Sequence, residues 1–275
     1  MEENDDTNGY AGNHLPGDWQ YKRTGQSDGF RPGAAARDRH PGMPGQAASP
    51  AASAELLLLD LSVQNSIRSA VAEFEKRYDH LDVLINNAAV FKPQRTLTAD
   101  GYETIFATNH LGPFLLSNLL LPRLEAATAA RILNVTAPST TRIAFEDLQA
   151  ERKFSAMHAF GASKAANLLF TYDLARRLAG TNVTVNAFFP GLVKTPLMRE
   201  APVPLRWLNP LFGQSPESVA QSLVYYASSP EVQKMTGMFF NKGGKSIASS
   251  PYTRDREVQR QLWEASMALA PLAVK

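Results

Sequence analysis

A few polar and turn-forming residues stand where short apolar runs end, and their positions favour ligand chemistry. Asp60 and Asn87 each follow an aliphatic run, and Pro190-Gly191 closes a third, with Thr195 four residues further on. In an open α/β sheet, ligands bind beyond the carboxyl ends of the strands. We therefore expect a site built from these ends. The structural alternatives are a helix cap for Asp60 or Thr195, and bracing of neighbouring strands for Asn87.

Two further candidates fall on expected helices. Asn109 lies inside a long helical stretch although asparagine is a poor helix former, which indicates a specific polar duty. Lys164 lies near the start of another helix and could bind a ligand hydroxyl, or be an ordinary helix lysine. The chain has no cysteine, so a thiolate zinc site is excluded and no metal is predicted.

Alternating apolar runs and amphipathic stretches must position these residues. This alternation is typical of βαβ units around a parallel sheet, so we predict an α/β fold with a doubly wound parallel sheet. The predicted strands are Leu56–Asp60, Leu81–Ile85, Arg131–Val135, Val183–Phe189 and Met238–Phe240. The first predicted helix could be capped by Ser62 and has Ile67, Val71, Phe74 and Tyr78 on one face. The others are Tyr102–Leu124, Phe160–Leu178, Pro216–Ser228 and Val258–Leu269.

The composition changes near residue 55. Residues 1–50 hold 8 of the 17 glycines, a single leucine, and neither valine nor isoleucine. Such a segment offers no β-branched strand and no periodic apolar face. We predict an irregular segment over residues 1–54 and a folded domain over residues 55–275.

Charge and hydropathy exclude several classes of function. The formal net charge of +2 gives no field that favours nucleic acid or an anionic membrane. The longest aliphatic run, Leu56–Leu59, is far shorter than the ~20 residues of a spanning helix. The acidic start, MEENDD, does not fit a secretory or mitochondrial leader. We expect a cytoplasmic protein without a membrane span.

Six motifs in order resemble the short-chain dehydrogenase/reductase family, in its retinol dehydrogenase-like branch. They are DLS at 60–62, NNAA at 86–89, TNHLG at 108–112, FEDLQAERKF at 145–154, FGASKAAN at 160–167 and PGLVKT at 190–195. Each alone is weak, but the ordered set covers about residues 55–270. The resemblance implies NAD or NADP as cofactor, a small lipophilic alcohol or carbonyl as substrate, and a homodimer through the two long helices.

The resemblance also assigns roles to residues. It implies that Asn109 and Lys164 belong to the catalytic group, Lys164 by lowering the pKa of a tyrosine and holding the nicotinamide ribose. The implied cofactor-binding residues are Asp60, Leu61, Asn87, Ala88, Lys164, Pro190, Gly191, Val193 and Thr195. The apolar stretch Leu197–Phe212 resembles the family's substrate lid, or is a loop packed on the domain.

The chain departs from the family at the centre of its chemistry. Phe160 stands where the family has its proton-transferring tyrosine, and Ala137 where it has the serine that holds the substrate oxygen. Loss of general acid–base catalysis alone costs ~10²- to 10⁴-fold. The substitutes within reach along the sequence are Thr136, Ser139 and His158.

The loop that the resemblance expects to bind the cofactor phosphates also differs from the family's pattern. Residues 24–30 fit TGxxxG, but residue 31 is arginine where the last glycine belongs, and no apolar strand precedes it. We therefore expect the first βαβ unit to be degraded or missing, which leaves the strand Leu81–Ile85 with an unpaired edge.

Three functions stay open from the sequence. The first is an oxidoreductase on a lipophilic alcohol or carbonyl, with catalysis lost or strongly impaired by Phe160 and Ala137. The second is a non-catalytic protein that binds a nucleotide or a partner. The third is a truncated product without independent function.

Overall fold

The computed structural model describes residues 55–194, 197 and 213–273. Of these, residues 59–273 belong to one compact unit and residues 55–58 to another, so each is described by itself. The predicted irregular segment 1–54, with its TGxxxG motif, and nearly all of the stretch Leu197–Phe212 lie outside the described residues, as does Thr195.

The compact unit is built on a parallel sheet of four strands, in the order β1-β2-β3-β4. The strands are β1 Val83–Asn86, β2 Ala130–Val135, β3 Val183–Phe189 and β4 Phe239–Asn241. In β2, Ile132 faces the main apolar cluster and its neighbour Leu133 a second one, so the sheet is buried on both faces. Near-continuous apolar strands are what such a sheet requires.

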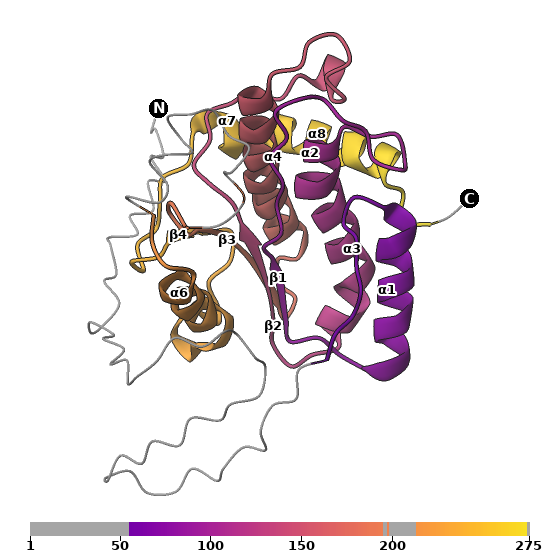
Figure 1. Cartoon of the computed structure of the whole chain (residues 1–275). Helices are drawn as coiled ribbons and strands as arrows, with labels where there is room; N and C mark the ends of the chain where they lie inside the picture. Colours follow the sequence, from indigo (N-terminus) through magenta and orange to yellow (C-terminus); the bar gives the residue numbers. More distant parts are fainter. Residues whose placement is uncertain (1–54, 195–196, 198–212, 274–275) are drawn as a thin grey trace, which may run out of the picture. The chain divides into compact units, whose positions relative to one another are not determined.

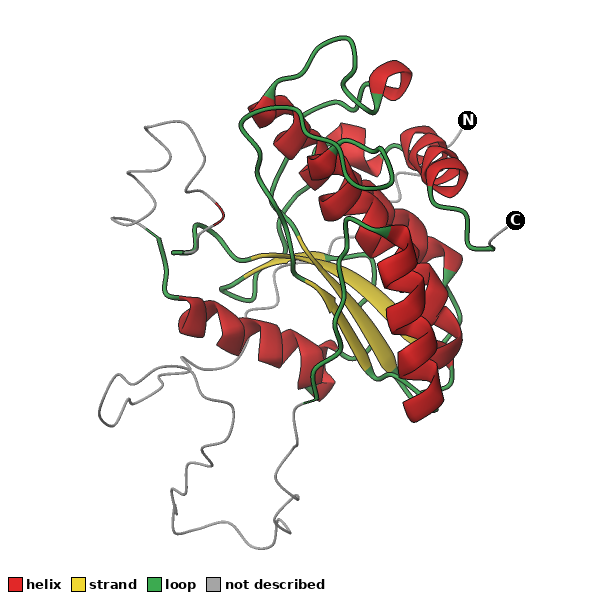
Figure 2. Cartoon of the chain, turned by 45° about the vertical axis from the view of Figure 1, so that its right-hand side comes forward, coloured by secondary structure: helices red, strands yellow, loops and turns green. Residues whose placement is uncertain are grey.

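Helices cover both faces of the sheet (Figure 1). The main helices are α1 Gln64–Arg77, α3 Gly112–Glu125, α4 Ala156–Arg177, α6 Pro216–Ser228 and α8 Arg256–Leu269, with the short α2 Thr104–Phe106 and α7 Pro251–Arg254. Figure 2 shows α6 on one side of the sheet and the larger group of helices on the other. This arrangement is a doubly wound, Rossmann-like α/β fold, which confirms the predicted fold class.

The helix α4 is the most deeply packed element. Every residue from Ser163 to Ala175 is buried, between the sheet on one side and α8 on the other. Trp263 of α8 packs edge-on against Phe114 of α3 at 5.0 Å between ring centroids and lies against Phe170 of α4 at 6.2 Å. The helix α8 therefore occupies much of the outer surface of the two long helices within the chain.

The predicted strand Leu56–Asp60 is wrong. These residues form no strand, and Leu56, Leu58 and Leu59 are exposed. A strand needs a neighbour for its backbone hydrogen bonds. Among the described residues the sheet ends at β1, which pairs with β2 alone, and Ile85 of β1 is 38% exposed.

Two other predictions differ from the structure in detail. Ser62 does not cap the first helix, because Val63 occupies the N-cap without a side-chain bond. Within the predicted helix Tyr102–Leu124, residues Ala107–Leu111 form a π-helical turn, η1, between α2 and α3. No helix within the described ranges is long and apolar enough to cross a membrane.

The π turn carries a fully buried histidine. His110 Nε2 lies 2.8 Å from Ser266 Oγ of α8, while its Nδ1 has no hydrogen-bond partner in the described part of the chain. Burial lowers the pKa of His110 from 6.5 to about 4, with a nearby Asn167 side chain opposing the shift weakly. The folded protein therefore keeps this imidazole neutral.

We expect the protein to lose stability on acidification. Between pH 6.5 and about 4, the unfolded chain binds a proton that folded His110 does not. The free energy of unfolding should therefore fall by about 1.4 kcal/mol per pH unit in this window. Urea unfolding from pH 7.5 to 4.5 measures this slope. It should shrink in His110→Gln but not in His80→Gln, an exposed control; equal slopes in both variants would contradict the assignment.

Candidate active site

The candidate site lies where β1 and β2 end and α4 begins, and Asn109 is the residue that joins these segments. Its Oδ1 accepts from Val90 N at 2.7 Å, and its Nδ2 donates to Val90 O at 3.0 Å and to Ser163 Oγ at 3.1 Å. Asn109 is 1% exposed and lies in the π turn. Single π turns inside helices occur frequently at functional sites.

Lys164 follows Ser163 and is buried at the same place. Its backbone oxygen accepts from the Thr136 hydroxyl at 2.9 Å, which fixes α4 against the end of β2. Its Nζ makes no hydrogen bond or ion pair with any described residue, and lies 5.2 Å from the centre of the Phe160 ring. Burial is the cause that lowers the pKa of Lys164 from 10.5 to about 8.

Two positions at which the family resemblance predicts a hydroxyl carry an apolar side chain, Phe160 and Ala137. Phe160 lies on the same face of α4 as Lys164, one turn earlier, and meets the buried Phe91 edge-on at 5.6 Å between centroids. A phenyl ring neither donates nor accepts a proton. Ala137, two residues beyond the end of β2, is half-buried and likewise carries no polar group.

None of the three substitute groups replaces the missing hydroxyls. The Thr136 hydroxyl is buried and donates to the backbone of α4. The Ser139 hydroxyl donates to Gly161 O at 2.8 Å and accepts from Thr141 N at 3.2 Å. His158 is exposed and lines a different pocket.

The residues predicted to bind a cofactor at the ends of the first two predicted strands differ in their surroundings. Asp60 Oδ1 accepts from the backbone N and the hydroxyl of Ser62, at 2.8 and 2.7 Å, so its carboxylate organises the turn before α1. The carbonyl of Leu61 packs so closely on α3 that a Cβ added at Gly112 would lie 2.3 Å from it. Asn87 and Ala88 are exposed beyond the end of β1.

The turn after β3 is formed as predicted, within the limits of the described residues. Gly191 adopts a φ of +77°, which favours glycine. Val193 forms a parallel bridge with Gln214, and Lys194 N donates to Gln214 O at 3.0 Å. Pro190 and Val193 are half-buried. No hydrogen bond among the described residues links this turn to Lys164.

Sequence reasoning missed two contributors to the site and a polar chain beneath it. Ser163 links Asn109 to Phe160, whose carbonyl accepts from its hydroxyl at 2.8 Å, and the SK pair at 163–164 could have signalled it. No pattern in the sequence marks Phe91 as part of the site.

A chain of polar side chains lies below the site. Asn86 Nδ2 donates to Asn134 Oδ1 at 2.8 Å, and Asn134 Nδ2 donates to Thr171 Oγ1 at 2.9 Å. These bonds tie β1, β2 and α4 together.

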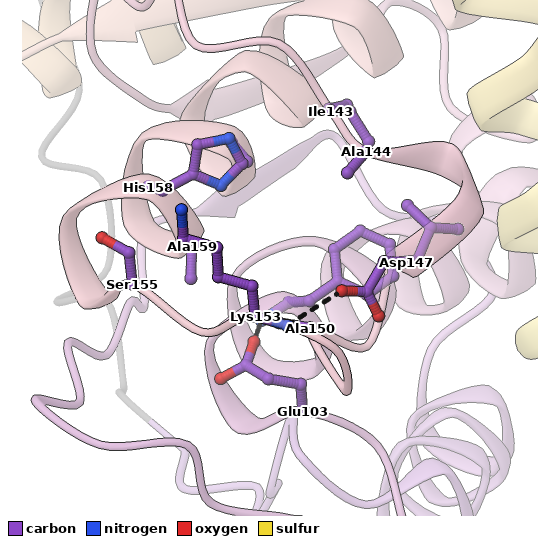
Figure 3. A pocket seen from close by; sticks show the side chains of 12 residues that line it. Glu103, Ile143, Ala144, Asp147, Ala150, Lys153, Ser155, His158 and Ala159 are labelled. Carbon is purple, nitrogen blue, oxygen red and sulfur yellow. Dashed lines mark hydrogen bonds between the residues drawn. The ribbon is translucent and has the colours of Figure 1, made fainter.

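A separate pocket lies beside the start of α4 (Figure 3). It is lined by Glu103, the 143–150 segment, Lys153 and the first turn of α4, and its volume of about 40 Å³ admits only a few water molecules. Burial raises the pKa of Glu103, although its carboxylate accepts from the backbone N of Ile105 and Phe106. The pocket is too small for a lipophilic substrate.

The four parallel strands and the polar cluster at their carboxyl ends define an α/β protein of Rossmann-like fold. The chain belongs to the short-chain dehydrogenase family, whose model matches residues 43–203. It is 41% identical to human retinol dehydrogenase 14 over 223 residues, which cover 78% of this chain and 66% of that protein. It is 40% identical to human retinol dehydrogenase 13, with 78% and 68% covered.

Solved structures agree with this family. A protein from Mycobacterium Paratuberculosis superposes with a TM-score of 0.58 at 33% identity, over 77% of this chain and 74% of the other. An NADPH-bound carbonyl reductase from chicken fatty liver gives a TM-score of 0.52 at 25% identity, over 70% and 76%. The chain spans just under two thirds of the length of the first curated relatives, at 66% of the human and 64% of the mouse retinol dehydrogenase 14.

We expect Asn109→Ala to destabilise the fold by about 2–3 kcal/mol, because it removes three hydrogen bonds and leaves half-buried backbone groups of Val90 unpaired. The matched control is Asn118→Ala, further along the same helical stretch, which removes one bond from Nδ2 to Phe114 O. It should cost about 1 kcal/mol or less. Urea unfolding measures the free energy of unfolding of both variants. An equal decrease in the two variants would contradict the role of Asn109 in joining the two segments.

Proposed function

We propose that this short-chain dehydrogenase homologue has lost, or very nearly lost, dehydrogenase turnover while keeping the lysine end of a nicotinamide nucleotide site. The observation that carries the proposal is the pairing of Lys164 with Phe160. The ammonium lies 5.2 Å from the centre of a phenyl ring and has no polar partner among the described residues. A lysine placed to activate a phenol therefore faces a side chain with no proton to transfer.

The fit to a nicotinamide nucleotide is partial. A buried ammonium without a partner suits ribose hydroxyls, so Lys164 would hold the nicotinamide ribose. Asp60, Leu61, Asn87, Ala88, Pro190, Gly191, Val193 and Thr195 complete the proposed cofactor contacts. The nucleotide, when bound, supplies hydride transfer. NAD and NADP are both candidates, because the residues that would bind the diphosphate and select between them are not among those described.

The substrate class follows from the relatives. The relatives are named retinol dehydrogenases, and retinol is a lipophilic alcohol. The proposed ligand is therefore a lipophilic alcohol or aldehyde. The packing of Phe160 on Phe91 supports this class, because it sets apolar ring surface beside Lys164. A cytoplasmic location belongs to the same proposal, supported by the absence of cysteine from the sequence. A homodimer would need a surface other than the faces of α3 and α4 that α8 covers.

Restoring the two hydroxyls should restore turnover. With retinal and either NADH or NADPH, we expect the wild-type protein to give no rate above the blank. The double variant Phe160→Tyr, Ala137→Ser should exceed it by at least ~10²-fold, because it regains a proton donor and an oxygen-positioning group. Phe91→Tyr is the control, since it adds a phenol to the neighbouring ring. Wild-type turnover equal to that of the double variant would overturn the proposal.

Nucleotide binding can be measured without turnover. A ligand that binds only the folded state raises the thermal midpoint, so millimolar NAD(H) or NADP(H) should raise it by a few degrees. Lys164→Met should abolish the rise, and Lys245→Met, an exposed lysine, should not. A midpoint that no nucleotide shifts would refute the retained cofactor site and leave only the loss of turnover.

A further inference from the structure

In the proposed function Lys164 would hold a ribose by hydrogen bonding, and the nucleophilic character of its amine has no role. Its Nζ lies beside Phe160, which in turn packs against Phe91, so two aromatic rings form one wall of its surroundings. It makes no hydrogen bond or ion pair within the described residues, although the residue is only 7% exposed. A lysine desolvated in apolar surroundings is one of the standard forms of an activated amine.

We propose that the Nζ of Lys164 binds lipophilic aldehydes covalently and reversibly, as an imine. The phenyl ring of Phe160 leaves the amine free, because within the described ranges Nζ has this ring beside it and no hydrogen-bond or ion-pair partner. A phenyl face attracts an ammonium weakly, by about 0.5–2 kcal/mol, whereas a carboxylate would hold it charged far more strongly.

The chemistry balances without an oxidant or a metal. The neutral amine adds to the carbonyl carbon, and a C=N double bond then replaces the C=O double bond of the aldehyde. The carbonyl oxygen leaves as water with the two protons that the amine nitrogen gives up. Hydrolysis reverses the step and releases the aldehyde. Burial lowers the pKa of Lys164 to about 8, with no contribution from any charged side chain, so about a tenth of the amine is neutral at pH 7.

The surroundings select the aldehyde by its apolar tail. Half-buried Phe160 offers ring surface beside the amine and is backed by buried Phe91. The carboxylates of Glu103 and Asp147 line a separate pocket, and no ion pair joins either of them to Lys164. We therefore expect a long-chain aldehyde to react faster than a short one.

The test is reductive trapping of the full chain with decanal and cyanoborohydride at pH 7, followed by peptide mass spectrometry. We expect one decyl group on Lys164, added on the order of 100-fold faster than on Lys153 or Lys245, which are both exposed. Propanal should label Lys164 more slowly than decanal. Lys164→Arg keeps the charge but should remove the fast label.

Two results would overturn the inference: labelling of Lys164 no faster than that of the exposed lysines, or equal rates for propanal and decanal. The experiment is run first without nucleotide, so it does not depend on the proposed cofactor site. Repeated with NADP(H) or NAD(H), protection of Lys164 would support the cofactor site. Fast labelling without protection would sustain the aldehyde adduct and count against nucleotide binding.

Discussion

The amide of Asn109 is the interaction on which the candidate site depends. It lies in a π turn, so the helix locally widens and presents the side chain to two other segments instead of to its own backbone. One edge of the amide pairs with both backbone groups of Val90, and the same nitrogen reaches Ser163. The loop after β1 and the first buried turn of α4 are thereby fixed to one another.

Because α4 is held at this point, Lys164 has little freedom to find a polar partner. Its backbone is anchored by Thr136, and its side chain extends along Phe160. In a site of this kind the lysine and a phenol act together, and each is expensive to bury alone. The chain has kept the buried lysine and replaced the phenol by a ring that packs on Phe91. On the proposed function, the scaffold of the family's chemistry would persist without the group that moves the proton.

The elements that the sequence predicted well are those whose pattern is set locally. Val183–Phe189 is a β-branched and aromatic run closed by Pro190, and the helix Pro216–Ser228 has a serine cap followed by proline; both bounds agree with the structure. The helix α4 starts at Ala156 and not at Phe160, with Ser155 at its N-cap but without a side-chain capping bond.

Other features depend on residues far apart in the chain. The apolar run Leu56–Leu59 reads as a strand, but strand formation requires a neighbour that periodicity cannot reveal. The polar duty of Asn109 was predicted from its poor helix propensity, whereas the partners Val90 and Ser163 come from packing. Phe91 is one of many phenylalanines in the sequence, and only the fold sets it against Phe160.

Lys164 is a buried ammonium without a polar partner among the described residues. The most direct measurement is an NMR titration of the lysine side chains, with Lys164 assigned by comparison with Lys164→Arg. We expect Lys164 to titrate near pH 8, because burial alone disfavours its charge. Titration of Lys164 at its ordinary value of 10.5 would contradict this expectation, and would mean that the amine is solvated or paired with a carboxylate.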